Sequence, residues 1–87
     1  MKVLLLTDSL GAGGAERQFC MLAKSLLDLG VTVKVHSFSE GFYARKLRSQ
    51  GIDLTITARR GQYDIRPARS VSALIREFQP DVVQTWW

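Results

Sequence analysis

The sequence predicts an α/β protein with an open, doubly wound parallel sheet in which four strands alternate with three helices as βαβαβαβ. The hydrophobic period switches repeatedly between strand-like and helix-like along the chain. Each helix-like segment separates two strand-like ones, an order typical of parallel strands joined by right-handed crossovers. The 87 residues are 46% hydrophobic and 23% charged, which is enough for one core. We therefore expect a single domain over residues 1–87.

Four apolar segments are predicted to be strands. Residues 3–6 form a short continuous apolar run, which is typical of a central strand covered on both faces. Over residues 31–38 valines alternate with polar side chains before Phe38, which indicates a second strand. The third and fourth strands are expected over residues 52–56 and 81–87.

Three segments carry the spacing of helices. Apolar residues recur at intervals of three and four over residues 14–29, and Gly30 is placed to end this helix. A shorter helix over residues 42–49 is expected to end at Gly51. After a basic loop over residues 57–65, Pro67 occupies a first helical turn, where proline is tolerated. The apolar stripe of this third helix consists of Ala68, Val71, Leu74, Ile75 and Phe78.

The last predicted strand has no successor in this sequence. A parallel strand buried on both faces normally has a neighbour on each side. We therefore expect a truncated piece of a larger domain, and we expect the isolated chain to self-associate through the edge of its fourth strand.

Charge and cysteine content restrict the environment and the partners. The net charge of +4 lies wholly in residues 44–87, which favours a solvated basic face over any particular partner, and we expect no nucleic acid. The longest apolar run is too short to span a bilayer. One cysteine, Cys20, permits neither an intrachain disulfide nor a cysteine-based zinc site. We expect a cytoplasmic protein, with peripheral contact to a membrane surface as an alternative, and no metal.

A glycine-rich turn with Gly11, Gly13 and Gly14 joins the first strand to the first helix. In a doubly wound sheet this turn lies at the ligand-binding edge, where free N–H groups of a helix start favour phosphate. A tight turn without a ligand is the alternative. The dinucleotide fingerprint G-x-G-x-x-G/A fails because Glu16 stands at its last position, and the P-loop pattern lacks its Lys-Ser or Lys-Thr.

Four blocks of the sequence occur in the order and spacing of a known family. They are GGAER at residues 13–17, LGVTV at 29–33, GI at 51–52 and QPDVV at 79–83. Together they cover nearly the whole chain, and the chain resembles the opening of a family 4 retaining glycosyltransferase with the GT-B fold. The resemblance implies half of an N-terminal, acceptor-side domain from an enzyme with two Rossmann-like domains.

The resemblance also implies substrates and site residues. Such an enzyme transfers a sugar from a nucleotide-sugar donor to an acceptor, here a glycan or a lipid-linked group, and no cofactor is expected. Gly13 and Gly14 would contact the donor diphosphate through backbone N–H groups. Glu16 would either contact the acceptor or complement the helix dipole. Arg59 could meet an anionic acceptor, although a solvated loop is the favoured interpretation.

No catalytic residue is predicted within the chain. Many relatives place a histidine near the end of the fourth strand, where this sequence has Gln84 and Trp86. The second domain would lie beyond residue 87, so we expect the chain alone to be inactive. Structural roles are favoured for Cys20 and for His36.

Two other functions remain open from the sequence. Gly11 and Gly13 after a strand, with Glu40 beyond the second strand, would fit a dinucleotide-binding fragment of an oxidoreductase. The other is a non-catalytic, flavodoxin-like module that pairs through its last strand.

Overall fold

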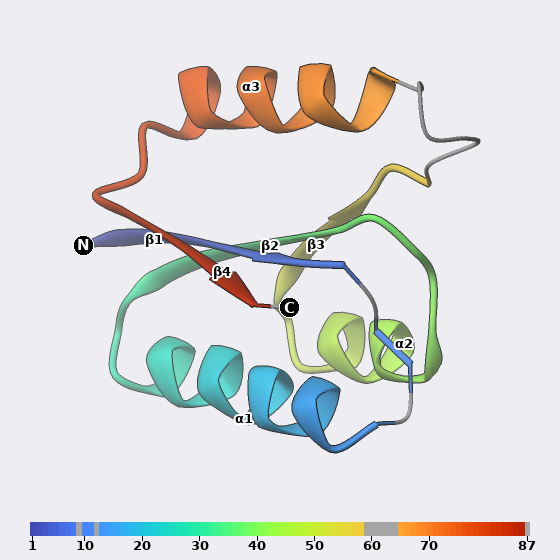
Figure 1. Ribbon diagram of the computed structural model, residues 1–87. Helices are drawn as coiled ribbons and strands as arrows, with labels where there is room; N and C mark the ends of the chain where they lie inside the picture. The colour runs from blue at the N-terminus through green and yellow to red at the C-terminus, as the bar shows by residue number, and fades with distance from the viewer. Residues whose placement is uncertain (9, 12, 59–64, 87) are drawn as a thin grey trace.

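The computed structural model describes residues 1–8, 10–11, 13–58 and 65–86 of the chain. Strands and helices alternate along it as the sequence predicts (Figure 1). The elements are β1 (Lys2–Thr7), α1 (Gly14–Asp28), β2 (Thr32–Ser37), α2 (Phe42–Ser49), β3 (Asp53–Ile56), α3 (Arg66–Phe78) and β4 (Val82–Trp86).

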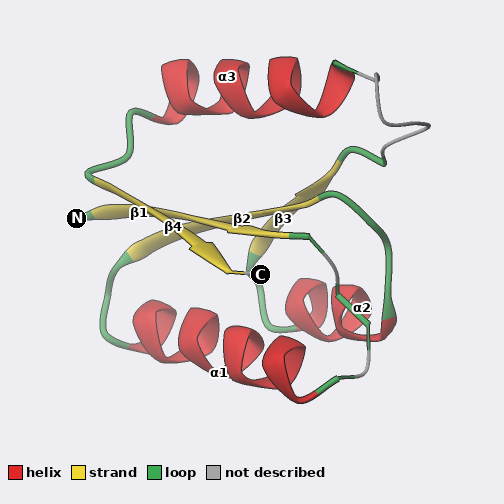
Figure 2. Ribbon diagram, in the orientation of Figure 1, coloured by secondary structure: helices red, strands yellow, loops and turns green. Residues whose placement is uncertain are grey.

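The four strands form one parallel sheet in the order β3-β2-β1-β4. The chain moves outward from β1 through β2 to β3 and then returns to place β4 on the other side of β1. Helices α1 and α2 cover one face of the sheet, and α3 covers the opposite face (Figure 2). The predicted open, doubly wound sheet is confirmed, and its order reverses between β1 and β4, where ligands bind in folds of this kind.

Strand β1 supplies both layers of the core. Val3 and Leu5 pack on the side of α1 and α2 around the fully buried Phe19. Leu4 and Leu6 point to the other face, where they meet Phe78 of α3. The uninterrupted apolar run of β1 is therefore explained by its position at the centre of the sheet, covered on both sides.

The helix ends follow from local backbone conformation. Gly30 and Gly51 have φ angles of 85° and 79°, which glycine adopts without strain, and they end α1 and α2 as predicted. Helix α3 ends at Gln79 with φ of 52°, a left-handed residue that the sequence did not reveal. The next turn is fixed to β1, because the backbone N–H of Asp81 donates to the carbonyl of Lys2 over 2.8 Å.

The buried face of α3 differs from the predicted stripe. Pro67 and Phe78 are buried and Val71 and Leu74 pack beside them, whereas Ala68 is exposed and Ile75 is 39% exposed. The predicted helix is confirmed, and these two residues of its apolar stripe lie outside the buried row. The helix therefore buries one row of side chains against Leu4 and Leu6 of β1 and leaves the flank of its stripe in solvent.

Among the residues that the structure describes, strand β4 lies at the edge of the sheet and pairs with β1 alone. Val82 and Val83 are each 43% exposed. Within the described residues, no helix combines the length and the apolar character needed to cross a membrane.

Candidate functional site

The glycine turn lies at the carboxyl end of β1, beside the point where the strand order reverses. Gly13 is the N-cap of α1, with φ of −78° and ψ of 168°, and its carbonyl accepts the N–H of Arg17 over 3.1 Å. The N–H groups of a first helical turn have no acceptor within the helix. Gly13 has no side chain to cap them, so the start of α1 presents N–H donors without an acceptor among the described residues, together with the positive end of the helix dipole.

Gly13 and Gly14 have different surroundings. The carboxylate of Glu16 folds back against Gly13 and occupies the space into which a Cβ would project there. At Gly14 a Cβ would meet no atom within 4 Å. The turn is therefore covered by Glu16 at Gly13 and open at Gly14. This position of the Glu16 carboxylate is the one expected for complementing the dipole of α1.

Leu10 anchors the turn from within. Its side chain is fully buried in the core beneath α1 and α2, although it belongs to no strand or helix. Its carbonyl accepts the backbone N–H of Tyr43, at the start of α2, over 2.9 Å. Gly41 lies flat against this segment, and a Cβ on it would overlap the Leu10 carbonyl group and the backbone nitrogen of Gly11.

The connection between β2 and α2 braces the start of the turn as well. The N–H of Phe38 donates to the carbonyl of Thr7 over 3.2 Å, and the hydroxyl of Ser39 donates to the carbonyl of Asp8 over 2.9 Å. Ser39 is itself held by the buried Ser37, whose hydroxyl donates to its carbonyl over 2.7 Å. A second loop thus fixes the backbone that leads into the glycines.

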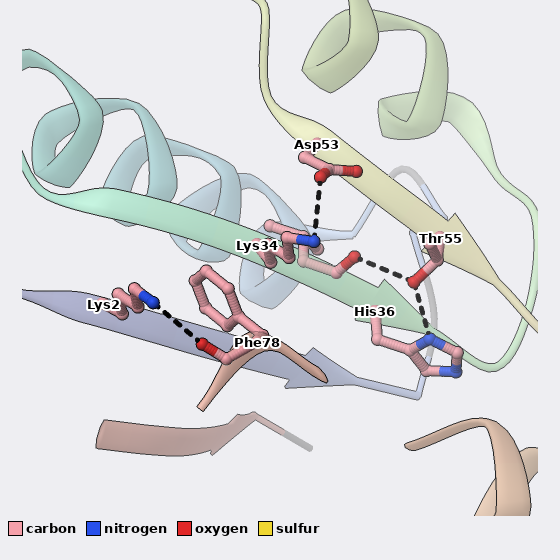
Figure 3. A network of polar contacts seen from close by, with 7 residues as sticks. Lys2, Lys34, His36, Asp53, Thr55 and Phe78 are labelled. Carbon is pink, nitrogen blue, oxygen red and sulfur yellow. Dashed lines mark hydrogen bonds and ion pairs between the residues drawn. The ribbon is translucent and has the colours of Figure 1, made fainter. Parts of the chain in front are cut away.

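His36 lies on the face of the sheet that α3 covers, near the carboxyl end of β2 (Figure 3). It is fully buried, its Nδ1 lies 2.8 Å from the Thr55 hydroxyl, and its ring meets Phe38 edge-on at 5.3 Å between centroids. Its Nε2 has no hydrogen-bond partner among the described residues. Burial lowers the pKa of His36, so the ring is neutral at pH 7. These contacts agree with a structural role.

The other polar contacts in Figure 3 lie on the same face of the sheet, at the end of α3. The ammonium of Lys34 lies 3.4 Å from the Asp53 carboxylate and 5.0 Å from the centre of the Phe78 ring. Lys2 approaches the same ring and donates to the Phe78 carbonyl over 3.3 Å. The two lysines hold the end of α3 on the sheet, away from the glycine turn.

The buried imidazole makes stability depend on pH. Because the pKa of His36 is lower in the folded state than its usual 6.5, the unfolded chain binds the proton more strongly. The contribution of the buried, neutral His36 to stability is therefore fully present above the pKa that this histidine has in the unfolded chain. It declines as the pH falls below that pKa. In urea unfolding between pH 7.5 and 5, the wild type should lose stability relative to His36→Gln, which does not titrate. Parallel pH profiles of the two proteins would contradict this cause.

Other residues considered from the sequence have defined places. Cys20 is 4% exposed, and burial raises the pKa of its thiol to about 11, so it is a protonated core residue at neutral pH. Gln84 is exposed on β4. Arg59 lies outside the described residues. Among residues that the structure describes, no three His, Cys, Asp or Glu side chains are grouped to hold a metal ion.

Leu10, Gly41 and Tyr43 were not identified from the sequence as parts of this site. The sequence did contain a signal for Leu10, because a large apolar side chain next to a run of glycines is suited to anchor the turn in the core. The sequence contained no such signal for Gly41, because any residue can adopt its φ of −178°. Glycine is required there only because the backbone of Leu10 and Gly11, distant in sequence, packs against it.

A glycine turn at the switch point of a doubly wound sheet, opening a helix with free N–H donors, defines a Rossmann-like domain with a ligand-facing edge. Glycosyltransferase Family 4 matches residues 12–87, and the chain belongs to this family. The resemblance carried by the four sequence blocks is thereby confirmed. No curated protein matches the sequence.

Proposed function

We propose that the chain is the N-terminal, acceptor-side part of a retaining glycosyltransferase that transfers a sugar from a nucleotide-sugar donor to a glycan or a lipid-linked acceptor. Family membership supports a transferase with sugar donors and acceptors. The observation that carries the proposal is the open backbone at Gly14, in the first turn of α1 at the ligand edge of the sheet. Family membership also favours this function over the oxidoreductase.

The geometry of the turn suggests how a donor diphosphate is received. Phosphate oxygens accept hydrogen bonds from N–H groups at the start of α1, where the helix dipole favours negative charge. Because the Glu16 carboxylate lies against Gly13 and repels anions, the phosphates approach from the side of Gly14. Binding through backbone groups requires no metal or cofactor from this part of the chain.

The remaining expectations belong to the whole enzyme. We propose that residues 1–87 are one Rossmann-like unit, that the second domain supplies the catalytic groups, and that the chain alone is inactive. The enzyme acts in the cytoplasm or peripherally at a membrane. The reading frame should then continue for roughly two domains' worth of chain, at about 100–200 residues each, and a stop codon directly after residue 87 would contradict this proposal.

Replacing Gly14 separates binding from folding. In Gly14→Ala the new methyl meets no protein atom and alanine is the better helix former, so the variant should be at least as stable as the parent. The methyl obstructs a ligand at the backbone, and we expect binding of a nucleoside diphosphate to weaken about tenfold, the scale of one lost hydrogen bond to a charged group. Titration followed by amide NMR should show shifts at residues 14–16 in the wild type.

Gln18→Ala is the control for this experiment, because Gln18 is exposed on α1 beyond the first turn and its loss should leave binding unchanged. Equal affinity of Gly14→Ala and wild type, or shifts confined to other regions, would contradict the proposed site. A parallel titration with NAD tests the oxidoreductase, which tight binding of NAD would support instead.

We also propose that the isolated chain self-associates through β4. The outer edge of β4 has no partner strand in the described part of the chain, and Val82 and Val83 are each 43% exposed. Open strand edges pair readily, and a lysine on the edge opposes this. Size-exclusion chromatography at rising concentration should show a growing mass for the wild type and a smaller one for Val83→Lys. A constant monomer mass for the wild type would exclude association.

A further inference from the structure

A groove of about 370 Å³ lies between α1 and α2. Arg17 and Lys24 line it from α1, and Lys46 lines it from α2. The buried Cys20 also lines the groove, together with the ring of Tyr43, which is half-buried. The proposed donor site at Gly14 does not involve this groove.

The groove is cationic, and none of the described residues that line it carries a carboxylate. Lys24 pairs with Asp28 one turn further along α1, at 2.6 Å, and both side chains are largely exposed. Among the described residues, neither Arg17 nor Lys46 forms an ion pair. The ammonium of Lys46 lies 5.9 Å from the centre of the Tyr43 ring. Two basic side chains from different helices therefore border the same groove, with no counter-ion in the part of the chain that the structure describes.

The charge of Lys46 reaches the inner end of the groove. It opposes the rise in the pKa of the Cys20 thiol, which burial dominates, whereas the charge of Glu16 adds to that rise. Glu16 is close enough to affect the Cys20 thiol, but its side chain is folded against Gly13 and is not among the residues that line the groove. The charged side chains described as lining the groove, Arg17, Lys24 and Lys46, are all cations.

We propose that this groove binds the phosphate group of a phosphate ester. Arginine and lysine form the short, charge-assisted hydrogen bonds that hold phosphate, and arginine can do so through two N–H groups at once. Ser25 and Gln50, which also line the groove, supply polar groups for the remaining oxygens. The volume exceeds that of a phosphate group, so there is room for the organic part of the ester beside Tyr43.

Such an ester is either a soluble metabolite or the headgroup of a phospholipid. The exposed Met21, at 52%, lies on the wall of the groove and would suit an acyl chain or a membrane surface as well as a soluble organic group. The phosphate contact is common to both sources, and the experiment distinguishes them.

The test measures binding of glycerol 3-phosphate to the 87-residue chain at constant ionic strength, by amide NMR. We expect saturable shifts in α1 and α2 around the groove, and we expect Arg17→Gln and Lys46→Gln each to weaken binding about tenfold. Arg45→Gln is the matched control, because it removes one positive charge from an exposed position of α2 that does not line the groove. Gly14→Ala should also leave this binding unchanged. The proposal for the groove and the proposal for the donor site are therefore tested independently.

A second arm uses phosphatidylcholine vesicles with and without phosphatidic acid in a sedimentation assay. Binding that needs phosphatidic acid and is lost in Lys46→Gln but kept in Arg45→Gln assigns the groove to a lipid headgroup. Binding of glycerol 3-phosphate without vesicle binding assigns it to a soluble ester. Absence of saturable binding in both arms, or equal loss in Lys46→Gln and Arg45→Gln, would overturn the proposal, since only general surface charge would then be at work.

Discussion

Leu10→Ala is expected to lower the free energy of unfolding by about 2–5 kcal/mol, the usual cost of removing a buried leucine side chain from a core. The side chain of Leu10 is fully buried, and it is the point at which the glycine turn is fixed to the core beneath α1 and α2. The neighbouring core cannot collapse readily into the space, because Phe19 and Leu47 are themselves fully buried and held by helices. Denaturation in urea, followed by circular dichroism, measures the loss.

Leu29→Ala supplies the matched control for this prediction. It makes the same chemical change at the end of α1, where the side chain is 79% exposed, and it should alter stability by less than about 0.5 kcal/mol. Similar losses in the two variants would show that Leu10 is not the anchor of the turn.

The alternation of strands and helices could be predicted from the sequence because each element carries its own period. The uninterrupted run of β1 indicated burial on both faces, and β1 is the strand that supplies both core layers. Gly30 and Gly51 marked helix ends because their positive φ is a local requirement. These features depend on residues within a few positions of one another, which is the range over which a single sequence is informative.

Features that depend on how separate elements pack were not predictable in this way. Ala68 and Ile75 fit the period of α3, but the sheet beneath decides which row of the helix is buried. Gln79 adopts a left-handed conformation without being glycine, at a position fixed by the contact between Asp81 and Lys2. In each case the deciding partner is remote in sequence.

The same distinction between local and remote determinants applies to the candidate site. The glycine turn was placed at the ligand edge from its position after the first strand, and the structure shows it there. The arrangement of Glu16 over Gly13, with Gly14 left open, depends on side-chain conformation. The basic groove was not anticipated, because Arg17 and Lys46 come together only when α1 and α2 pack side by side.

The bracing of the turn bears directly on the proposed function. A loop that already has its bound conformation loses less conformational entropy when a ligand arrives. Hydrogen bonds from Phe38, Ser39 and Tyr43 hold three backbone carbonyl groups that precede α1 in the chain, those of Thr7, Asp8 and Leu10. The donors at the start of α1 are therefore positioned by β2 and α2 as well as by β1.

Gly41→Ala tests this bracing at its closest contact. A Cβ at Gly41 would overlap the Leu10 carbonyl group and the nitrogen of Gly11, which are backbone atoms and cannot turn aside as a flexible side chain could. Either α2 or the glycine turn must shift, and we expect a loss of stability of at least about 1–3 kcal/mol, the usual cost of overpacking. The amide resonances of residues 10–14 should move together with those at the start of α2.

Gly14→Ala is the natural control, because it adds the same methyl group where no atom lies within 4 Å. The two variants should have different defects. Gly41→Ala should lose stability and alter the geometry of the turn, whereas Gly14→Ala should lose ligand binding alone. If Gly41→Ala were as stable as Gly14→Ala and left the resonances of the turn unchanged, the contact between α2 and the turn would not be what holds the candidate site in shape.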